Sequence, residues 1–87
     1  MKQFKNILQK IETAEAKLCQ AENNLQYIKA LKSCLFWLIR FDAMAQKSDT
    51  IANSAEYRAM FTTGAGWSFF DRVQNSILEY NYGVKPF

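Results

Sequence analysis

FKNILQKIETAEAKLCQAENNLQYI, the segment from Phe4 to Ile28, carries the clearest structural pattern in this chain. Its apolar residues repeat every seven positions in two interleaved sets, which is the spacing of an α-helix that packs along another helix. We call these eight residues the heptad seam: Phe4, Ile7, Ile11, Ala14, Leu18, Ala21, Leu25 and Ile28. A seam of this kind needs a second helix to cover it, so the sequence predicts association before it predicts chemistry.

Helix-breaking residues are concentrated late in the sequence. The glycines and the proline all lie in the last third: Gly64, Gly66, Gly83 and Pro86. Since neither residue type interrupts the first 63 positions, we expect a long helix that begins near Lys2 and runs at least to Ile28. No stop signal precedes Gln46, so this helix either continues straight to about Ala45 or bends near Ser33.

Two shorter helices are expected after the long one, at about residues 51–61 and 67–80. Ser48 and Asp49 form a turn or an N-cap cluster, residues 62–66 form a glycine-containing loop, and Gly83 marks a helix stop. No strand pattern competes with these helices, so the fold class is all-α, of the coiled-coil or helical-bundle type. We expect one domain, with a heptad segment at 1–30 and a compact, aromatic-rich part at 31–87.

The expected helix lengths leave the heptad seam without enough cover inside the chain. The two shorter helices span about 38 Å together, whereas a helix that reaches Ala45 would be about 60 Å long. We therefore expect the C-terminal helices to pack on residues 31–41. There Phe36, Trp37 and Ile39 fall off the main apolar stripe, which suggests burial on more than one side. The N-terminal heptads are then left for a partner helix, such as that of a second copy.

The orientation of such a helix pair stays open. In a parallel homodimer Lys10 meets Glu15 of the second copy and Lys17 meets its Glu22, so opposite charges favour that arrangement. The small seam residues Ala14 and Ala21 instead permit close antiparallel packing, including packing within one chain. The seam is thus either a contact between two chains or the core face of a monomeric helical bundle.

Composition places the chain among folded cytoplasmic proteins. A hydrophobic fraction of 49% and a charged fraction of 22% are typical of a folded domain, and a chain of 87 residues has a marginal core without oligomerisation. No signal peptide is visible, and the longest uncharged run in the most apolar stretch, residues 33–39, is far too short to span a membrane. Cys19 and Cys34 would lie far apart on one helix, so we expect free thiols in a reducing compartment.

Enzymatic chemistry finds little support in the sequence. The chain has no His, which removes the commonest general base and metal ligand, and its two Cys lack the spacing of a zinc site. Gly64 and Gly66 precede a helix but lack the lysine and the preceding strand of a phosphate-binding loop. We predict that the chain is not an enzyme and uses no cofactor or metal.

Surplus aromatic residues point instead to binding. Four of them exceed what one helix face buries: Trp67, Phe69, Tyr82 and Phe87. Residues of this kind anchor protein interfaces, and they form a candidate partner surface. We therefore predict a non-enzymatic protein–protein interaction module that self-associates through the heptad seam. Such a module acts as a small adaptor, regulator or inhibitor of a larger protein, whose identity the sequence does not contain.

Nucleic acid is the alternative partner. The net charge is +3 with a pI of 9.0, and four N-terminal lysines supply candidate phosphate contacts: Lys2, Lys5, Lys10 and Lys17. These lysines are spread around the helix rather than aligned along one stripe, so protein remains the favoured partner. Binding to a membrane surface through the aromatic tail ranks lower still.

Overall fold

A computed structural model of the chain describes residues 2–62 and 66–87, with side chains from residue 5 onward. Those ranges contain five helices: α1 (Lys2–Cys19), α2 (Asn24–Gln46), α3 (Asp49–Ala52), α4 (Ala55–Phe61) and α5 (Phe69–Asn81). The all-α prediction is confirmed, and the described ranges contain no strand. None of these helices is long and apolar enough to cross a membrane.

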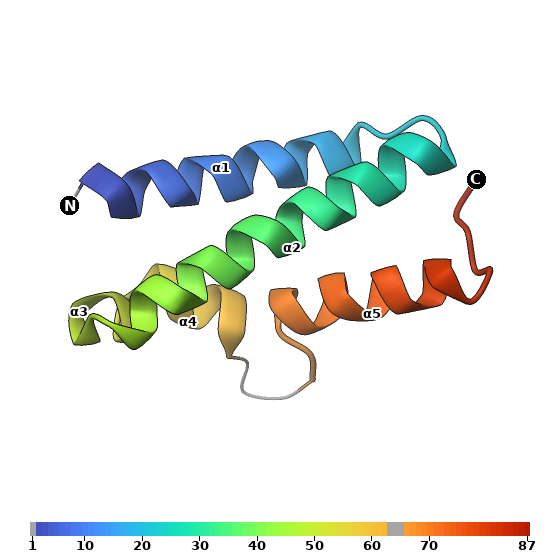
Figure 1. Cartoon of the computed structure of the whole chain (residues 1–87). Helices are drawn as coiled ribbons and strands as arrows, with labels where there is room; N and C mark the ends of the chain where they lie inside the picture. The colour runs from blue at the N-terminus through green and yellow to red at the C-terminus, as the bar shows by residue number, and fades with distance from the viewer. Residues whose placement is uncertain (1, 63–65) are drawn as a thin grey trace.

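α1 and α2 form an antiparallel hairpin, so the single long helix expected from the sequence is wrong (Figure 1). The chain reverses at residues 20–23, where Asn23 leaves helical geometry and its side chain accepts the backbone N–H of Gln26 at 2.9 Å. Asn is a weak helix former and a strong N-cap, so it begins a new helix without help from Gly or Pro. The bend expected near Ser33 is also wrong, because α2 passes through Ser33 unbroken.

α2 is the central helix, with α1 along one flank and α4 and α5 along another (Figure 1). Its buried residues form the middle of the core: Ile28, Ala30, Leu31, Cys34, Leu38, Phe41 and Ala45. Ile7, Ile11 and Ala14 of α1 join the same cluster, together with Ile51 of α3 and Val73 of α5. Burial of one large aliphatic side chain contributes about 1.5–3 kcal/mol, so the α1–α2 contact is a main source of stability.

The helices lie nearly side by side, which makes the molecule flat. Its Cα extents are 40 × 28 × 16 Å. The shortest extent, 16 Å, is less than half of the longest. The accessible surface of 6056 Å² exceeds the roughly 5,300 Å² typical of a compact monomer of 10.1 kDa. One side of α2, which carries Lys32, Phe36 and Ile39, is left exposed.

Serine side chains cap all three C-terminal helices: Ser48 for α3, Ser54 for α4 and Ser68 for α5. At α5 the Asp71 carboxylate also accepts the Ser68 N–H, which completes a capping box. The N-cap expected near Ser48 is confirmed, but the helix expected at 51–61 is two helices because Ser54 starts a new one. α5 matches the helix expected at 67–80, with bounds of Phe69 and Asn81.

α5 ends at a glycine, as the sequence predicts. Gly83 has φ +96°, in the left-handed region that favours glycine. Its N–H donates to the Tyr80 carbonyl, and the Val84 N–H donates to the Glu79 carbonyl. These two bonds form a Schellman motif and satisfy the last carbonyls of the helix. Most of the loop expected at 62–66 falls on residues 63–65, which lie outside the described residues.

An aromatic cluster joins α2 to α4 and α5. The rings of Tyr57 and Phe61 stack with centroids 4.6 Å apart, and Phe61 lies 5.1 Å from Phe70. Phe41 meets Tyr57 edge-on at 5.7 Å. The Tyr57 hydroxyl donates a 2.6 Å hydrogen bond to Asp42, and this bond raises the pKa of Tyr57 to about 12. These contacts attach α4 and the start of α5 to α2 around Phe41, and Tyr80 of α5 stacks on Tyr27 nearer the start of α2.

Candidate functional site

The outer side of α2 carries a stripe of exposed residues. They recur every three or four positions, so the helical period places them on one face: Leu25, Lys29, Lys32, Phe36, Ile39, Arg40, Ala43 and Lys47. Leu25, Phe36 and Ile39 are 62%, 48% and 52% exposed. Large apolar side chains scattered singly are ordinary on a surface, but here three of them share one face with four cations.

The outer stripe contains no carboxylate. The one acid in α2, Asp42, lies toward α4, where its side chain accepts the Tyr57 hydroxyl. It also accepts the side-chain amide of Gln46 at 3.1 Å. The positive charges of the outer stripe are therefore not neutralised from within their own helix.

One flank of α1 extends this positive charge. Lys10 and Lys17 line cavities shared with α2, whereas Glu15 lines a cavity on the opposite flank with Arg72 and Val73 of α5. We call the six cations and the two apolar residues among them the basic face: Lys10, Lys17, Lys29, Lys32, Phe36, Ile39, Arg40 and Lys47. Six of the chain's eleven Lys and Arg residues thus lie on one side of the hairpin.

A groove of about 580 Å³ lies in the basic face, between α1 and the second half of α2. We call it the Trp37 groove, and its lining residues are Asn6, Ile7, Lys10, Trp37, Arg40, Ala43, Met44 and Lys47. Buried Ile7 and half-buried Trp37 and Met44 give it an apolar floor. Exposed Lys10 and the cations of α2 give it a positive rim, and no carboxylate is among its lining residues.

Cations lie over the ring of Trp37, which lines this groove, and over the neighbouring ring of Phe36. Lys10 Nζ is 5.7 Å from the centroid of the Trp37 ring. The Arg40 guanidinium lies 4.4 Å from the Phe36 ring and 5.8 Å from the Trp37 ring, and these two rings meet edge-on at 4.9 Å. Each exposed cation–π contact contributes about 0.5–1 kcal/mol, enough to position the rim side chains without neutralising their charge.

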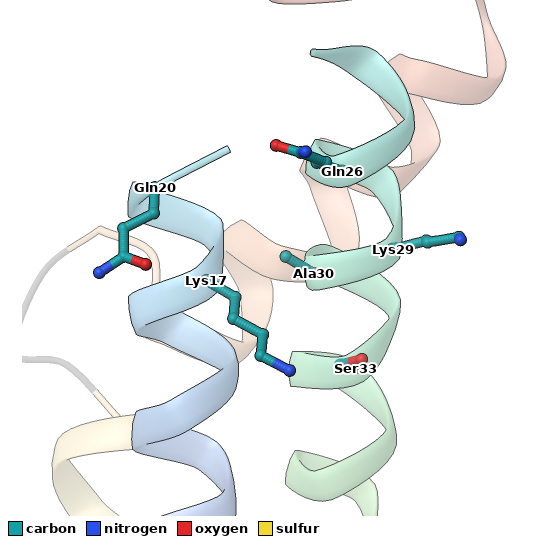
Figure 2. Close-up of a pocket in the computed structure, with 6 residues that line it drawn as sticks. All are labelled: Lys17, Gln20, Gln26, Lys29, Ala30 and Ser33. Carbon is teal, nitrogen blue, oxygen red and sulfur yellow. The ribbon is translucent and has the colours of Figure 1, made fainter. Parts of the chain in front are cut away.

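A second cavity, of about 420 Å³, lies between α1 and α2 nearer the α1–α2 turn (Figure 2). Figure 2 shows Lys17 reaching from α1 toward Ser33 of α2, whereas Lys29 points away from the gap. Gln20, Gln26 and Ala30 complete the lining. This cavity continues the positive charge along the hairpin, but it lacks the large apolar floor of the Trp37 groove.

The heptad seam is used largely inside the chain. Four of its residues are buried in the core: Ile7, Ile11, Ala14 and Ile28. Leu18 is half-buried, Ala21 lies in the α1–α2 turn, and Leu25 is exposed on the outer stripe. The Phe4 side chain lies outside the described part of the chain. The seam is therefore not one continuous stripe, because the reversal at residues 20–23 divides it, and α2 covers its first half.

The four aromatic residues expected to form a partner surface do not lie together. Trp67 and Phe69 are at the start of α5, and Tyr82 and Phe87 lie beyond its other end, about 20 Å away along the helix axis. Phe69 packs partly against the core, whereas Tyr82 is 85% exposed. The backbone of Phe87 makes two hydrogen bonds, of 3.0 and 3.1 Å, with the Asn24 side chain. These residues therefore belong to two separate regions of the molecule, one at each end of α5.

The structure corrects the expectation that Phe36 and Ile39 are buried. Apolar residues all round the 31–41 segment suggested cover on more than one side, yet α1, α4 and α5 leave the outer side of α2 free. The overlooked signal is the helical spacing of Lys32 and Arg40 with these apolar residues, which marks a second, outward face.

The lysines expected to contact phosphates do not all lie on the same side of α1. Lys10 and Lys17 lie on the basic face beside the cations of α2. Lys5 is exposed, but the helical period places it well round α1 from Lys10. The Lys2 side chain lies outside the described part. The basic face is thus assembled by the hairpin, not by α1 alone.

The two cysteines are unpaired thiols, as expected, but they lie on different helices rather than far apart on one helix. Cys34 is fully buried, and burial is the main cause that raises the pKa of its thiol to about 11. A neutral, buried thiol is a core residue rather than a nucleophile. Cys19 is exposed at the end of α1.

Within the residues that the structure describes, no three His, Cys, Asp or Glu side chains are grouped so that they could hold a metal ion. No protein-family model, curated protein or solved structure matches the chain. The basic face and its Trp37 groove are therefore the candidate functional site.

Proposed function

We propose that this chain is a non-enzymatic interaction module that binds an acidic, partly apolar segment of a larger protein on its basic face. The observation that carries this proposal is the Trp37 groove, whose apolar floor is surrounded by Lys10, Arg40 and Lys47 without a carboxylate in the lining. An apolar side chain of the partner would fill the floor, and flanking carboxylates would pair with the rim. Such a module suits a small adaptor, regulator or inhibitor.

The dimensions of the face suit a helical segment of the partner. From Lys29 to Lys47, α2 rises about 27 Å, and a groove between two helices receives the apolar side of an amphipathic helix. The chain also exposes several hundred Å² more surface than a compact monomer of its mass, comparable with the roughly 800 Å² that one partner contributes to a standard interface.

Nucleic acid is a second candidate, favoured by one observation. Lys10 and Lys17 lie beside the cations of α2, so six positive charges share one side of the hairpin. Protein remains the first candidate because Phe36 and Ile39 are exposed among these charges, and phosphates do not use apolar side chains. Six phosphate contacts would give duplex binding a steep salt dependence, with a logarithmic slope of about −5.

The fluorescence of Trp37 provides a direct test. Trp67→Phe leaves Trp37 as the single tryptophan of the chain. The probe is a synthetic amphipathic helix of Leu and Glu, about four turns long. We expect a saturable change in Trp37 fluorescence at physiological salt. A peptide of the same composition in scrambled order, which has no apolar side, is expected to bind at least about tenfold more weakly.

Two matched variants locate the binding. Arg40→Glu reverses a charge at the groove and should weaken binding by more than tenfold, about 1.4 kcal/mol. Arg58→Glu reverses another exposed arginine, on α4 and away from the basic face, and should leave the affinity unchanged. Equal affinities for the two variants, or no binding of the Leu/Glu helix, would refute the proposal. Tighter binding of an oligonucleotide, with the steep salt slope, would favour the second candidate.

A further inference from the structure

The Trp37 groove and the second cavity, which Figure 2 shows, follow each other along the hairpin. Lys10 lines the groove and Lys17 lines the cavity, and a separation of seven residues places both on the same side of α1. On α2, Trp37 of the groove and Ala30 of the cavity are also seven residues apart. Because α1 and α2 run antiparallel, the two hollows lie on one side of the hairpin, about 10 Å apart.

The second cavity differs from the Trp37 groove in the chemistry of its lining. It has one apolar side chain, the small and buried Ala30. The other five lining side chains all carry N–H or O–H donors: Lys17, Gln20, Gln26, Lys29 and Ser33. No carboxylate and no aromatic ring is among the lining residues. An apolar ligand would gain little there, whereas an anion would meet donors and two positive charges.

The donors come from both helices. Figure 2 shows Lys17 of α1 reaching toward Ser33 of α2, so both side chains border the gap between the helices. Lys29 points away from the gap, but it is exposed, and an exposed side chain changes rotamer within nanoseconds. The Gln26 side-chain oxygen accepts the Glu22 N–H at 2.9 Å, which leaves the side-chain NH2 group to donate. One anion between the helices can therefore be held from both sides.

A phosphate group suits these donors better than a carboxylate does. A phosphorylated side chain carries a charge of about −1.5 to −2 at pH 7 and three strong acceptor oxygens, whereas a carboxylate carries one charge on two oxygens. The second cavity offers two lysines and a volume of about 420 Å³. Its small side chains, Ala30 and Ser33, leave room for the bulkier group between the helices.

We propose that the second cavity binds a phosphorylated serine or threonine of the same partner segment whose apolar side fills the Trp37 groove. This inference rests on the function proposed above and adds its regulation, since phosphorylation of the partner would strengthen binding. The separation of the two hollows equals the rise of about seven residues of an α-helix. A helical partner therefore carries its phosphate about seven residues from its apolar anchor, on the same side of the helix.

Synthetic helices test this spacing. Each is a Leu/Glu helix with its leucines in one half and Ser, Glu or phosphoserine at a single position in the other half. In one series this position lies seven residues before the middle leucine, and in a second series seven residues after it, so that both directions of the partner are covered. Binding is followed by Trp37 fluorescence in the Trp67→Phe chain. In one series we expect phosphoserine to bind about tenfold more tightly than Ser, with Glu between them.

A control peptide separates the position of the phosphate from its charge. Moving the phosphoserine by two residues turns it about 200° round the helix at the same net charge. This peptide should bind at least about fivefold more weakly than the peptide with the matched spacing. Equal affinities of the phosphoserine and Ser peptides in both series would overturn the inference and leave the proposed function standing. If none of the peptides bound, the proposed function would fail, and this inference with it.

Two lysines of α1 give a matched pair of variants. Lys17→Gln removes a charge from the second cavity and should reduce the preference for phosphoserine over Ser from about tenfold to about threefold. Lys5→Gln removes the same charge from another side of α1 and should keep the full preference. Both positions are exposed, so both variants are expected to fold. Equal preferences in the two variants would overturn the assignment of the phosphate to the second cavity.

An oligonucleotide is the other source of phosphate to be compared. It supplies the charge but no apolar side for the Trp37 groove, so the phosphoserine helix should bind more tightly than a single-stranded oligonucleotide of equal charge at the same salt concentration. Tighter binding of the oligonucleotide, weakened by Lys17→Gln but not by Lys5→Gln, would assign the second cavity to nucleic acid and overturn the phosphopeptide.

Discussion

Two aromatic clusters lie on α2, and they differ in what covers them. Phe41 is fully buried and contacts Tyr57 and Phe61 of α4. Phe36, five residues earlier, is 48% exposed, and its nearest partners are the Trp37 ring and the Arg40 guanidinium. Two phenylalanines of one helix therefore have opposite environments, because the chain supplies helices for only two sides of α2.

The polar groups of the two clusters differ in the same way. In the inner cluster the Tyr57 hydroxyl is matched by a carboxylate, Asp42. In the outer cluster Lys10 and Arg40 lie over rings, and the Trp37 groove holds no carboxylate. The inner cluster is thus complete in itself, whereas the outer one has unbalanced charge beside an apolar floor. Aromatic residues alone do not separate the core from a candidate binding surface; the groups around them do.

The largest difference is expected when each phenylalanine is truncated. Phe41→Ala should lower the free energy of unfolding by about 3–5 kcal/mol, since it leaves a cavity in the centre of the core. Phe36→Ala removes the same atoms from the surface of the same helix and should cost less than about 1 kcal/mol. Urea denaturation followed by circular dichroism measures both values.

A domain of this size has a total stability of only about 4–13 kcal/mol, so Phe41→Ala could prevent folding. Phe41→Leu keeps most of the side-chain volume and provides a milder version of the same comparison. Equal losses at positions 36 and 41 would mean that the outer cluster is covered in solution, for instance by a second chain.

A smaller effect is expected when the hydroxyl of the inner cluster is removed. Tyr57→Phe keeps the ring stacked on Phe61 but deletes the hydrogen bond to Asp42, which should cost about 1 kcal/mol at neutral pH. The loss should be measured by urea denaturation as a difference from the wild type. Asn75→Ala breaks an exposed side-chain hydrogen bond, to Glu79, and serves as a control with little effect.

The Tyr57 contribution should also depend on pH. In the folded chain the pKa of Tyr57 is raised from its ordinary value of 10.0 to about 12. A group with a raised pKa contributes its full stability below pH 10, and that contribution is lost as the pH rises toward 12. The stability difference between the wild type and Tyr57→Phe should therefore be constant below pH 10 and shrink above it. A difference that grows in that range would contradict the assigned hydrogen bond.

The smallest effect is expected at the cations of the outer cluster. Arg40→Met should cost about 0.5–1 kcal/mol, because it keeps the apolar stem but removes the charge over the Phe36 and Trp37 rings. Arg40→Lys retains a cation and should cost less. Thermal unfolding of the three proteins, at equal ionic strength, gives the order. A variant Arg40→Met more stable than the wild type would show that repulsion on the basic face outweighs the cation–π contacts.

Local signals predict much of this fold. The Ser48 cap and the glycine stop at Gly83 both appear where the sequence places them. Each depends on a few neighbouring residues, so it can be recognised without knowledge of the rest of the chain. The helical character of these segments was predictable for the same reason.

The α1–α2 reversal was not predictable in this way. Residues 20–23 contain neither Gly nor Pro, and the heptad spacing continues across them. The Asn23 cap competes with helix propagation by only about 1 kcal/mol, so the outcome depends on the contacts made after the chain has turned. Those contacts, of Ile7 and Ile11 with α2, are far apart in sequence and leave no local mark.

The candidate site was missed for a related reason. The number of aromatic residues near the C-terminal end predicts a partner surface there, yet Trp67 and Tyr82 lie at opposite ends of α5. The basic face combines Lys10 of α1 with Arg40 of α2, which come together only through the hairpin. A helix exposes its own periodicity in its sequence, but it does not reveal which neighbour lies beside it.

The amino-acid sequence alone therefore establishes an all-α chain and identifies the residues of α1 that require cover, because residue spacing encodes the two sides of a helix. It does not establish which helix provides that cover. The structure assigns it to α2 of the same chain, since a short connection keeps α2 at a high effective concentration beside α1. Because α1 packs on one side of α2, the outer side of α2 stays free, and this free side carries most of the basic face. That face arises from how few helices the chain has to pack around α2, a property of the whole molecule.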